Sequence, residues 1–175
     1  MMVLIIPTLG YEHESLYLSQ LSNTGMSIKD LSEVRGSPYT KATATLDAMT
    51  TGADIIFQAT LLSTNLLGHP DFLRKVNTPS RFGAFSYEVV DTKLARHPKP
   101  SFIIQLCFYS ELVSELQGLR SRSMHVVLGD GSELNFRLDQ YREYYQTLKD
   151  RFLYQMSHDG IDNSCLLYTS DAADE

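Results

Sequence analysis

Hydrophobic and polar residues follow two different periods along this chain, and each period predicts one kind of secondary structure. Apolar residues recur at near-helical spacing, which is typical of amphipathic helices, over the segments 11–23, 38–52, 101–117 and 139–156. Short runs rich in aromatic and β-branched residues are typical of strands and occupy the segments 54–62, 67–76, 84–92, 124–128 and 134–138. This order predicts an α/β domain in which a mixed central sheet is flanked by helices.

Capping and turn residues agree with these boundaries. Pro38 and Pro100 suit the first turns of two predicted helices, and Gly118 suits the end of one. Asp139 suits the N-cap of the last helix. The turn at 129–131 would join the last two strands as a hairpin.

The composition is that of a folded soluble domain. Hydrophobic residues make up 43% of the 175 residues and charged residues 21%, which fits one globular domain. Two cysteines are too few for a disulfide scaffold. The apolar run at 1–6 is broken by Pro7 and is too short for a signal peptide or a membrane span. We therefore expect a cytoplasmic protein with no membrane partner.

The end of the chain has a different character. Residues 165–175 resemble the translation of a sequencing adapter, and such a segment is excluded from reasoning about the fold. The alternative is an ordinary acidic tail, and we expect disorder in either case. We assign 1–164 to one domain, and we expect the natural polypeptide to continue beyond it.

Two acidic residues and a lysine stand out in the predicted strands. Alternation along 84–92 places Asp91 and Lys93 on one face, with Glu88 and Thr92 on the other. Asp71 lies in the preceding apolar strand, where a carboxylate is costly to bury unless it is paired or binds a metal. Carboxylates beside an amine suit metal-assisted phosphodiester cleavage. The plainer alternatives are an ion pair at a strand end, and an aspartate that caps a turn.

Two helices add polar side chains to this set. Gln105 and Tyr109 lie one turn apart, so they share a helix face and could contact a phosphate, or simply satisfy a buried polar network. His13 falls in the first turn of the first helix, where it could be a surface residue or a neutral metal ligand. Glu14 and His69 are reserve candidates. Cys107 lies in an apolar helix, where a buried thiol usually acts as a small hydrophobic residue.

The order of these residues resembles one nuclease family. The series is His13, Gly68-x-x-Asp71, Asp91-x-Lys93 and Gln105-x-x-x-Tyr109. It is similar to the RecB-like branch of the PD-(D/E)xK superfamily, and closest to the nuclease domains that are fused to a helicase in long bacterial proteins. The segment YEVVDTKLAR, followed by QLCFYSELVSELQG, carries the resemblance, which covers roughly residues 9–156.

The resemblance implies a restriction-endonuclease-like core with defined roles for these residues. The metal ligands would be His13, Asp71, Asp91 and the carbonyl oxygen of Thr92. Lys93 would be the catalytic lysine. Gln105 and Tyr109 would position the nucleic acid strand.

The implied activity is a Mg²⁺- or Mn²⁺-dependent deoxyribonuclease, the exonuclease domain of a helicase–nuclease in DNA repair or recombination. Its partners would be DNA and a helicase domain in the same natural polypeptide. An inactive DNA clamp beside a helicase, and an enzyme of the same fold that acts on junctions or RNA, are the alternatives. Many relatives bind an iron–sulfur cluster through cysteines, but Cys107 and Cys165 have no suitable spacing. Such a cluster could lie only in the missing C-terminal part.

Net charge does not by itself indicate a DNA-binding protein. The chain carries −6, and removal of the three acids in the tail leaves −3, whereas free-standing DNA-binding domains are usually basic. Between residues 72 and 100, however, basic residues outnumber acidic ones and could contact phosphates. These basic residues are Arg74, Lys75, Arg81, Lys93, Arg96 and Lys99.

Overall fold

The structure is a computed structural model that describes residues 6–64 and 66–158. The elements in chain order are α1 (Ile6–Ser22), β1 (Ile28–Asp30), α2 (Pro38–Thr51), β2 (Ile55–Phe57), β3 (Leu61–Leu62), β4 (Leu67–Gly68), β5 (Phe72–Val76), β6 (Ser86–Thr92), α3 (Pro100–Gln117), β7 (Ser123–Val127), β8 (Glu133–Arg137) and α4 (Leu138–His158). The tail at 165–175, with Cys165, lies outside the described residues. Within them, no helix is both long and apolar enough to cross a membrane.

The central sheet is mixed, as the sequence predicts. Its order is β1-β2-β5-β6-β7-β8, with a separate two-stranded sheet formed by β3 and β4. The β1–β2 and β6–β7 pairs are parallel, and the other pairs are antiparallel. An α/β domain with a mixed sheet flanked by helices is therefore confirmed.

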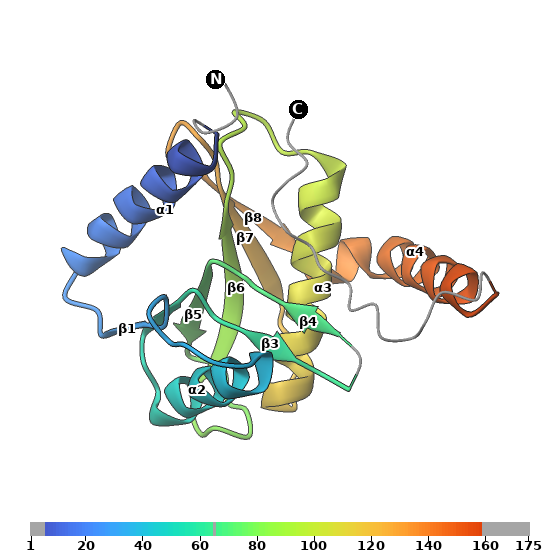
Figure 1. Cartoon of the computed structure of the whole chain (residues 1–175), viewed down its shortest axis with the longest axis horizontal. Coiled ribbons are helices and arrows are strands. Elements are labelled where there is room, and N and C mark those ends of the chain that lie inside the picture. The colour runs from blue at the N-terminus through green and yellow to red at the C-terminus, as the bar shows by residue number, and fades with distance from the viewer. Residues whose placement is uncertain (1–5, 65, 159–175) are drawn as a thin grey trace.

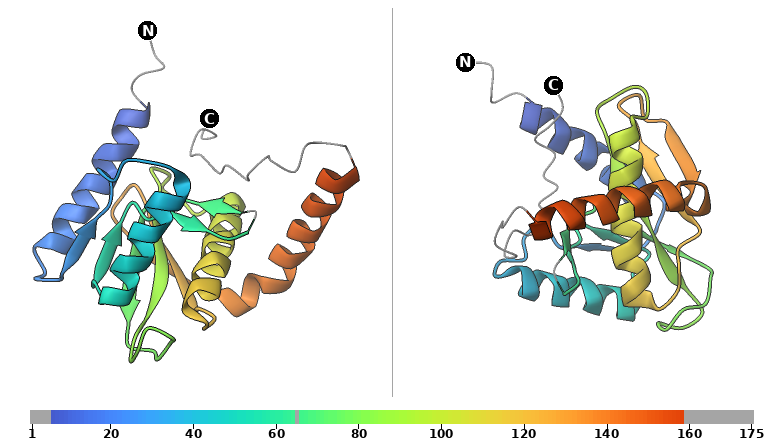
Figure 2. Two further views of the ribbon diagram at one scale, coloured as in Figure 1. Left: turned by 60° about the horizontal axis from the view of Figure 1, so that its bottom comes forward. Right: turned by 90° about the vertical axis from the view of Figure 1, so that its right-hand side faces the viewer.

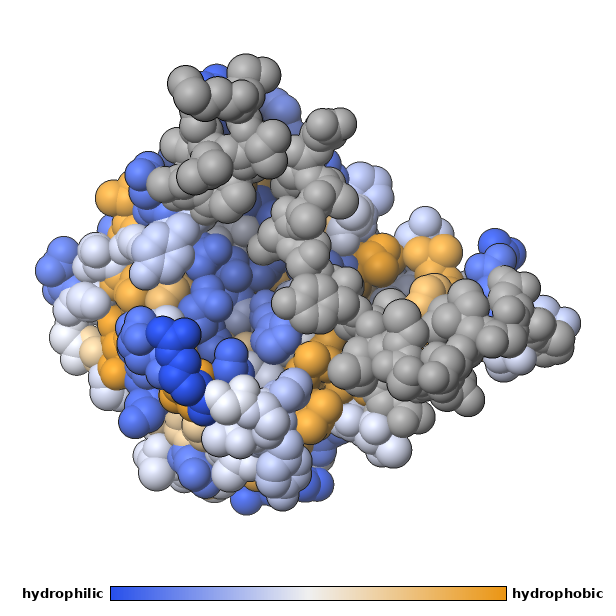
Figure 3. All heavy atoms as spheres, in the orientation of Figure 1, coloured by the Kyte–Doolittle hydropathy of each residue, from blue (hydrophilic) through white to orange (hydrophobic). Residues whose placement is uncertain are grey.

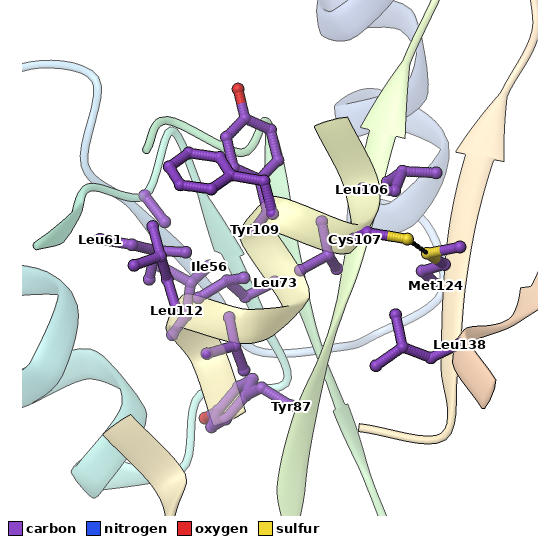
Figure 4. Close-up of a cluster of buried hydrophobic side chains, with 14 of the residues drawn as sticks. Ile56, Leu61, Leu73, Tyr87, Leu106, Cys107, Tyr109, Leu112, Met124 and Leu138 are labelled. Carbon is purple, nitrogen blue, oxygen red and sulfur yellow. Dashed lines mark hydrogen bonds between the residues drawn. The ribbon is translucent and has the colours of Figure 1, made fainter. Parts of the chain in front are cut away.

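Helices cover both faces of the sheet (Figures 1 and 2). Between the helices and the sheet lie two apolar cores. The larger core joins α2 and α3 to one face, with Tyr87, Leu106 and Met124 among its buried members (Figure 4). The smaller core lies under α1 on the other face, around Phe57 and Phe72. These two layers hold the strand ends between α1 and α3, where the candidate residues lie.

Cys107 belongs to the larger core. Its Sγ lies 3.9 Å from Sδ of Met124, and burial raises the pKa of the thiol to about 11. A thiol in this environment stays protonated at neutral pH and acts as an apolar packing group. The expected core role of this cysteine is confirmed.

The last helix, α4, projects from the body of the domain (Figure 1). Its first half is fixed to α3 by Tyr145 and Lys149, which both donate to the carboxylate of Glu111. Asp139 does not cap this helix, because α4 begins one residue earlier and Asp139 pairs with Arg137 from within the first turn. A groove of about 820 Å³ separates α3 from α4.

Two strand predictions were wrong in detail, and one strand was not predicted. The run 54–62 is two strands, because Gln58 adopts a left-handed backbone with φ 55° and turns the chain out of the main sheet. The run 67–76 is also two strands, interrupted at Pro70, which has no N–H to donate to a ladder. β1 was missed, since its three residues are too few to show a period.

Candidate active site

The candidate residues meet where β5 begins and β6 ends. Phe72 pairs with Val90 between these antiparallel strands, so Asp71 lies beside the last residues of β6. Oδ2 of Asp71 accepts hydrogen bonds from both the backbone N–H and Oγ1 of Thr92, each at 2.7 Å. The backbone N–H of Asp71 donates to Oδ1 of Asp91 across 3.4 Å. Backbone pairing thus makes neighbours of two aspartates that are distant in the sequence.

Lys93 supplies a cation next to the aspartates. Its Nζ lies 3.0 Å from Oδ2 of Asp91 and 5.6 Å from the centre of the Phe102 ring at the start of α3. The predicted common face of Asp91 and Lys93 is therefore confirmed. Asp71, Asp91 and Lys93 are only 5%, 2% and 6% exposed. Charged groups are rarely buried to this degree without a specific compensating partner.

Neighbouring carboxylates act on the ionisation of Asp71. Burial, the charge of Asp91 and the charge of Glu14 raise the pKa of Asp71 well above its usual value, although the hydrogen bonds from Thr92 oppose the shift. The carboxylates of Asp91 and Glu14 therefore disfavour the ionised form of Asp71. An additional cation would relieve this repulsion and restore the ionised form of Asp71.

Helix α1 places His13 and Glu14 over the same end of the sheet. Glu14 is near enough to Asp71 to act on its charge. Nε2 of His13 lies 3.4 Å from the carbonyl oxygen of Val127, which also accepts from the backbone N–H of Lys93 at 2.8 Å. The imidazole is thus held beside the strand ends by a backbone contact. Figure 3 shows hydrophilic side chains gathered in a hollow between α1 and α3.

A polar network on the sheet attaches α1. The hydroxyl of Tyr17 donates to Glu133 at 3.2 Å, and Arg74 binds both oxygens of the same carboxylate. His125 contacts Glu133 at 3.1 Å and Glu88 at 3.0 Å. Hydrogen bonding from His125, together with Arg74, lowers the pKa of Glu133 to about 2 despite its burial. As predicted, Glu88 points away from Asp91, and its role here is structural.

Helix α3 packs against β6 and carries Gln105 and Tyr109. The side-chain amide of Gln105 donates to the hydroxyl of Tyr109 at 2.8 Å, so their predicted common face is confirmed. The Tyr109 ring belongs to the larger apolar core, while its hydroxyl points away from the buried hydrophobic side chains (Figure 4). A Cβ at Gly68 would come within 2.9 Å of the Tyr109 ring and of Leu112. Glycine is therefore required here for the close approach of β4 to α3.

The donor set suits a hard divalent cation. Carboxylate oxygens are the ligands that Mg²⁺ prefers, and Mg²⁺ is commonly held by only one or two carboxylates because it keeps several waters. Asp71 and Asp91 meet that requirement. Among the described residues, no group of three or more His, Cys, Asp and Glu side chains is gathered closely enough to hold a metal ion. His13 contacts the carbonyl oxygen of Val127 rather than the aspartates.

Sequence reasoning missed parts of this arrangement. Gln58 was not a candidate, yet its side-chain amide donates to Glu14 at 2.7 Å. Half of the basic residues in the predicted basic stretch are neutralised, because Arg74, Lys75 and Lys93 form ion pairs with acidic residues. The reserve candidate His69 contacts Oγ1 of Thr60 at 3.3 Å, and burial lowers its pKa. Contacts of this kind between distant segments leave no periodic signal in a sequence.

Comparisons with known proteins do not assign the chain. Neither a protein-family model nor a curated protein matches its sequence. Site geometry and motif order are therefore the only indications of what this chain does.

Proposed function

We propose that this chain is a metal-dependent nuclease domain of the RecB-like PD-(D/E)xK type that hydrolyses DNA phosphodiester bonds. In its natural setting it acts as the exonuclease part of a helicase–nuclease polypeptide in DNA repair or recombination. The observation that carries the proposal is the buried contact between Asp71, Asp91 and Lys93 at the ends of two adjacent strands. A domain that only binds DNA has no need to bury repelling carboxylates beside a lysine.

Asp71 and Asp91 are the residues that would hold Mg²⁺ or Mn²⁺, with the Thr92 carbonyl oxygen and His13 as further ligands. When bound, the ion supplies positive charge next to the phosphate and makes a water more acidic. The repulsion that the neighbouring carboxylates exert on buried Asp71 supports that assignment.

The remaining residues act on the substrate directly. The ammonium group of Lys93 orients the attacking water and stabilises the negative charge that develops on the phosphate oxygens. It is suited to this role because burial strengthens its electrostatic interactions. Gln105 and Tyr109 hold the strand in line for attack, since correct orientation supplies a large part of rate enhancement.

The proposal is tested by following cleavage of end-labelled DNA with Mg²⁺ or Mn²⁺ and with a chelator. Asp91→Asn and Lys93→Met should each lower the rate at least about 100-fold, which is the usual effect of removing one group that stabilises the transition state. Lys75→Met is the matched control, because Lys75 is also ion-paired but belongs to the Asp54 pair. That variant should cleave at the wild-type rate.

Removing one member of a buried ion pair can also destabilise the fold by about 3–5 kcal/mol. The double variant Asp91→Asn/Lys93→Met removes both charges of this ion pair and should fold while remaining inactive. Cleavage by this folded double variant, or metal-independent cleavage by the wild type, would contradict the proposal. DNA binding without cleavage in the wild type would instead favour an inactive clamp.

A further inference from the structure

The loop between β6 and α3 carries positive charge next to the candidate site. This β6–α3 loop, residues 93–99, reads KLARHPK, so it contains Lys93, Arg96 and Lys99 and no acidic residue, although the whole chain carries a net charge of −6. Figure 1 shows the loop at the same end of the sheet as the first turns of α1. Basic residues are thus gathered at the strand end where the buried aspartates lie.

One aromatic ring relates the two lysines of this loop. Nζ of Lys93 lies 5.6 Å from the centre of the Phe102 ring, and Nζ of Lys99 lies 5.7 Å from the same centre. Both distances are within the range of a cation–π interaction. Lys93 is buried and ion-paired with Asp91, whereas Lys99 is exposed. The loop therefore presents an exposed lysine beside the buried one.

Backbone features at both ends fix the β6–α3 loop. Near its start, the N–H of Gly129 donates to the carbonyl oxygen of Ala95 at 3.1 Å. A Cβ at Gly129 would collide with the carbonyl oxygen of Leu94, so glycine permits this close approach. At its end, Lys99 stands between two prolines and has the extended backbone, φ −107° and ψ 151°, that a following proline favours. A residue that is already fixed in this way loses less freedom when it binds a ligand.

We propose that Lys99 binds a phosphate of the DNA backbone next to the scissile phosphate, and that the substrate strand lies along the β6–α3 loop. This inference rests on the proposed function, in which Lys93 faces the scissile phosphate. Phosphates follow one another at about 3.4 Å of rise along a strand, so a second ammonium group close to Lys93 meets a neighbouring phosphate. Contacts of this kind position a nucleic acid without reading its sequence.

A purely structural role for Lys99 predicts a different result. The aliphatic part of a lysine can cover an aromatic ring while its charge stays in water. Lys99→Met keeps that coverage of Phe102 and removes the charge, whereas Lys99→Arg keeps the charge. Lys29→Met is the matched control, because Lys29 is also exposed but lies on β1, which β2 and β5 separate from β6.

The test measures the binding of labelled DNA by fluorescence anisotropy over a range of salt, with a chelator so that no cleavage occurs. Each phosphate contact contributes about 0.9 to the slope of log K against log salt for duplex DNA, and about 0.7 for single strands. Lys99→Met should bind every sequence more weakly and reduce that slope by about one contact. Its loss of affinity relative to the wild type should therefore shrink roughly threefold between 50 and 200 mM salt. Lys99→Arg and Lys29→Met should keep the wild-type slope.

The outcomes separate this inference from the proposed function. Wild-type binding in Lys99→Met, or weaker binding with an unchanged slope, would overturn the inference, because no phosphate contact would then have been lost. An equal loss in Lys29→Met would also overturn it, since the effect would then come from net charge. A wild type that binds DNA through Lys99 but does not cleave it with Mn²⁺ would overturn the proposed function instead. A wild type that does not bind DNA would overturn both.

Discussion

Replacing Asp71 by asparagine separates the electrostatic cost of the site from its function. The carboxylate of Asp71 is buried, and its pKa is raised by burial and by the charges of Asp91 and Glu14. Asparagine has nearly the same shape, and its carbonyl oxygen can accept the two hydrogen bonds that Thr92 donates. The substitution therefore removes charge and repulsion while it keeps the local hydrogen bonding.

The size of the effect follows from the interactions that are lost. At an effective dielectric constant of about 20, two unit charges about 6 Å apart interact by roughly 3 kcal/mol. Part of this repulsion is already offset by Lys93, which lies 3.0 Å from Asp91. We expect Asp71→Asn to stabilise the metal-free protein by about 2 kcal/mol at pH 8. For a domain of this size, that gain raises Tm by roughly 4–8 °C.

The gain should depend on pH in one direction. Because folding raises the pKa of Asp71, its contribution to stability is fully present below the unfolded pKa of about 3.9 and is lost as pH rises through the folded pKa. The wild type should therefore approach the variant in stability as pH falls, since the aspartate is then protonated. Adding Mn²⁺ at pH 8 should reverse the order, because only the wild type binds it tightly.

Thermal unfolding by calorimetry, with a chelator and then with Mn²⁺, measures each of these differences. A variant that is less stable than the wild type at pH 8 without metal would refute the repulsion argument. A stability gain that stays constant down to pH 4 would refute the assignment of the effect to Asp71. An unchanged order of stability in Mn²⁺ would refute the role of Asp71 in binding the cation.

Three further predictions concern residues around the site. Glu88→Gln should keep wild-type cleavage in the DNA assay, because Glu88 contacts His125 away from the acidic group. Burial lowers the pKa of His125, but hydrogen bonds to Glu133 and Glu88 raise it overall. The stability that protonated His125 contributes should therefore be lost as pH rises above its unfolded pKa of about 6.5. In the Asp71→Asn background, His125→Gln should remove this pH dependence, which denaturant unfolding at several pH values would measure. Gly68→Ala should destabilise by about 1–3 kcal/mol because its methyl group would displace the Tyr109 ring, and urea unfolding would detect it.

The sequence predicts local relations in this protein well. The two-residue spacing of Asp91 and Lys93 on a strand, and the four-residue spacing of Gln105 and Tyr109 on a helix, each correspond to a direct contact. Such pairs are determined by the period of one element, which the side-chain pattern reveals. The mixed sheet follows in the same way from the order of its helices and strands.

Relations between distant segments were predicted less well. The bond from Gln58 to Glu14 joins a loop to α1, and the pairing of Arg74 with Glu133 joins two strands that are not neighbours in the sheet. Neither contact repeats along the chain, so no periodic signal exists to detect it. The break at Gln58 also escaped prediction, because glutamine is not a residue that favours a left-handed backbone.

The residues of the candidate site are attached to the fold in two ways. Asp71 and Asp91 are fixed by backbone pairing between β5 and β6, which a rigid sheet holds in place. Glu14 and His13 arrive on α1, which is attached by polar side chains such as Tyr17 and Gln58 and by the smaller apolar core. A cation bound between these groups would contact both layers at once. Metal affinity and the docking of α1 must then strengthen each other equally, because coupling between two equilibria is reciprocal.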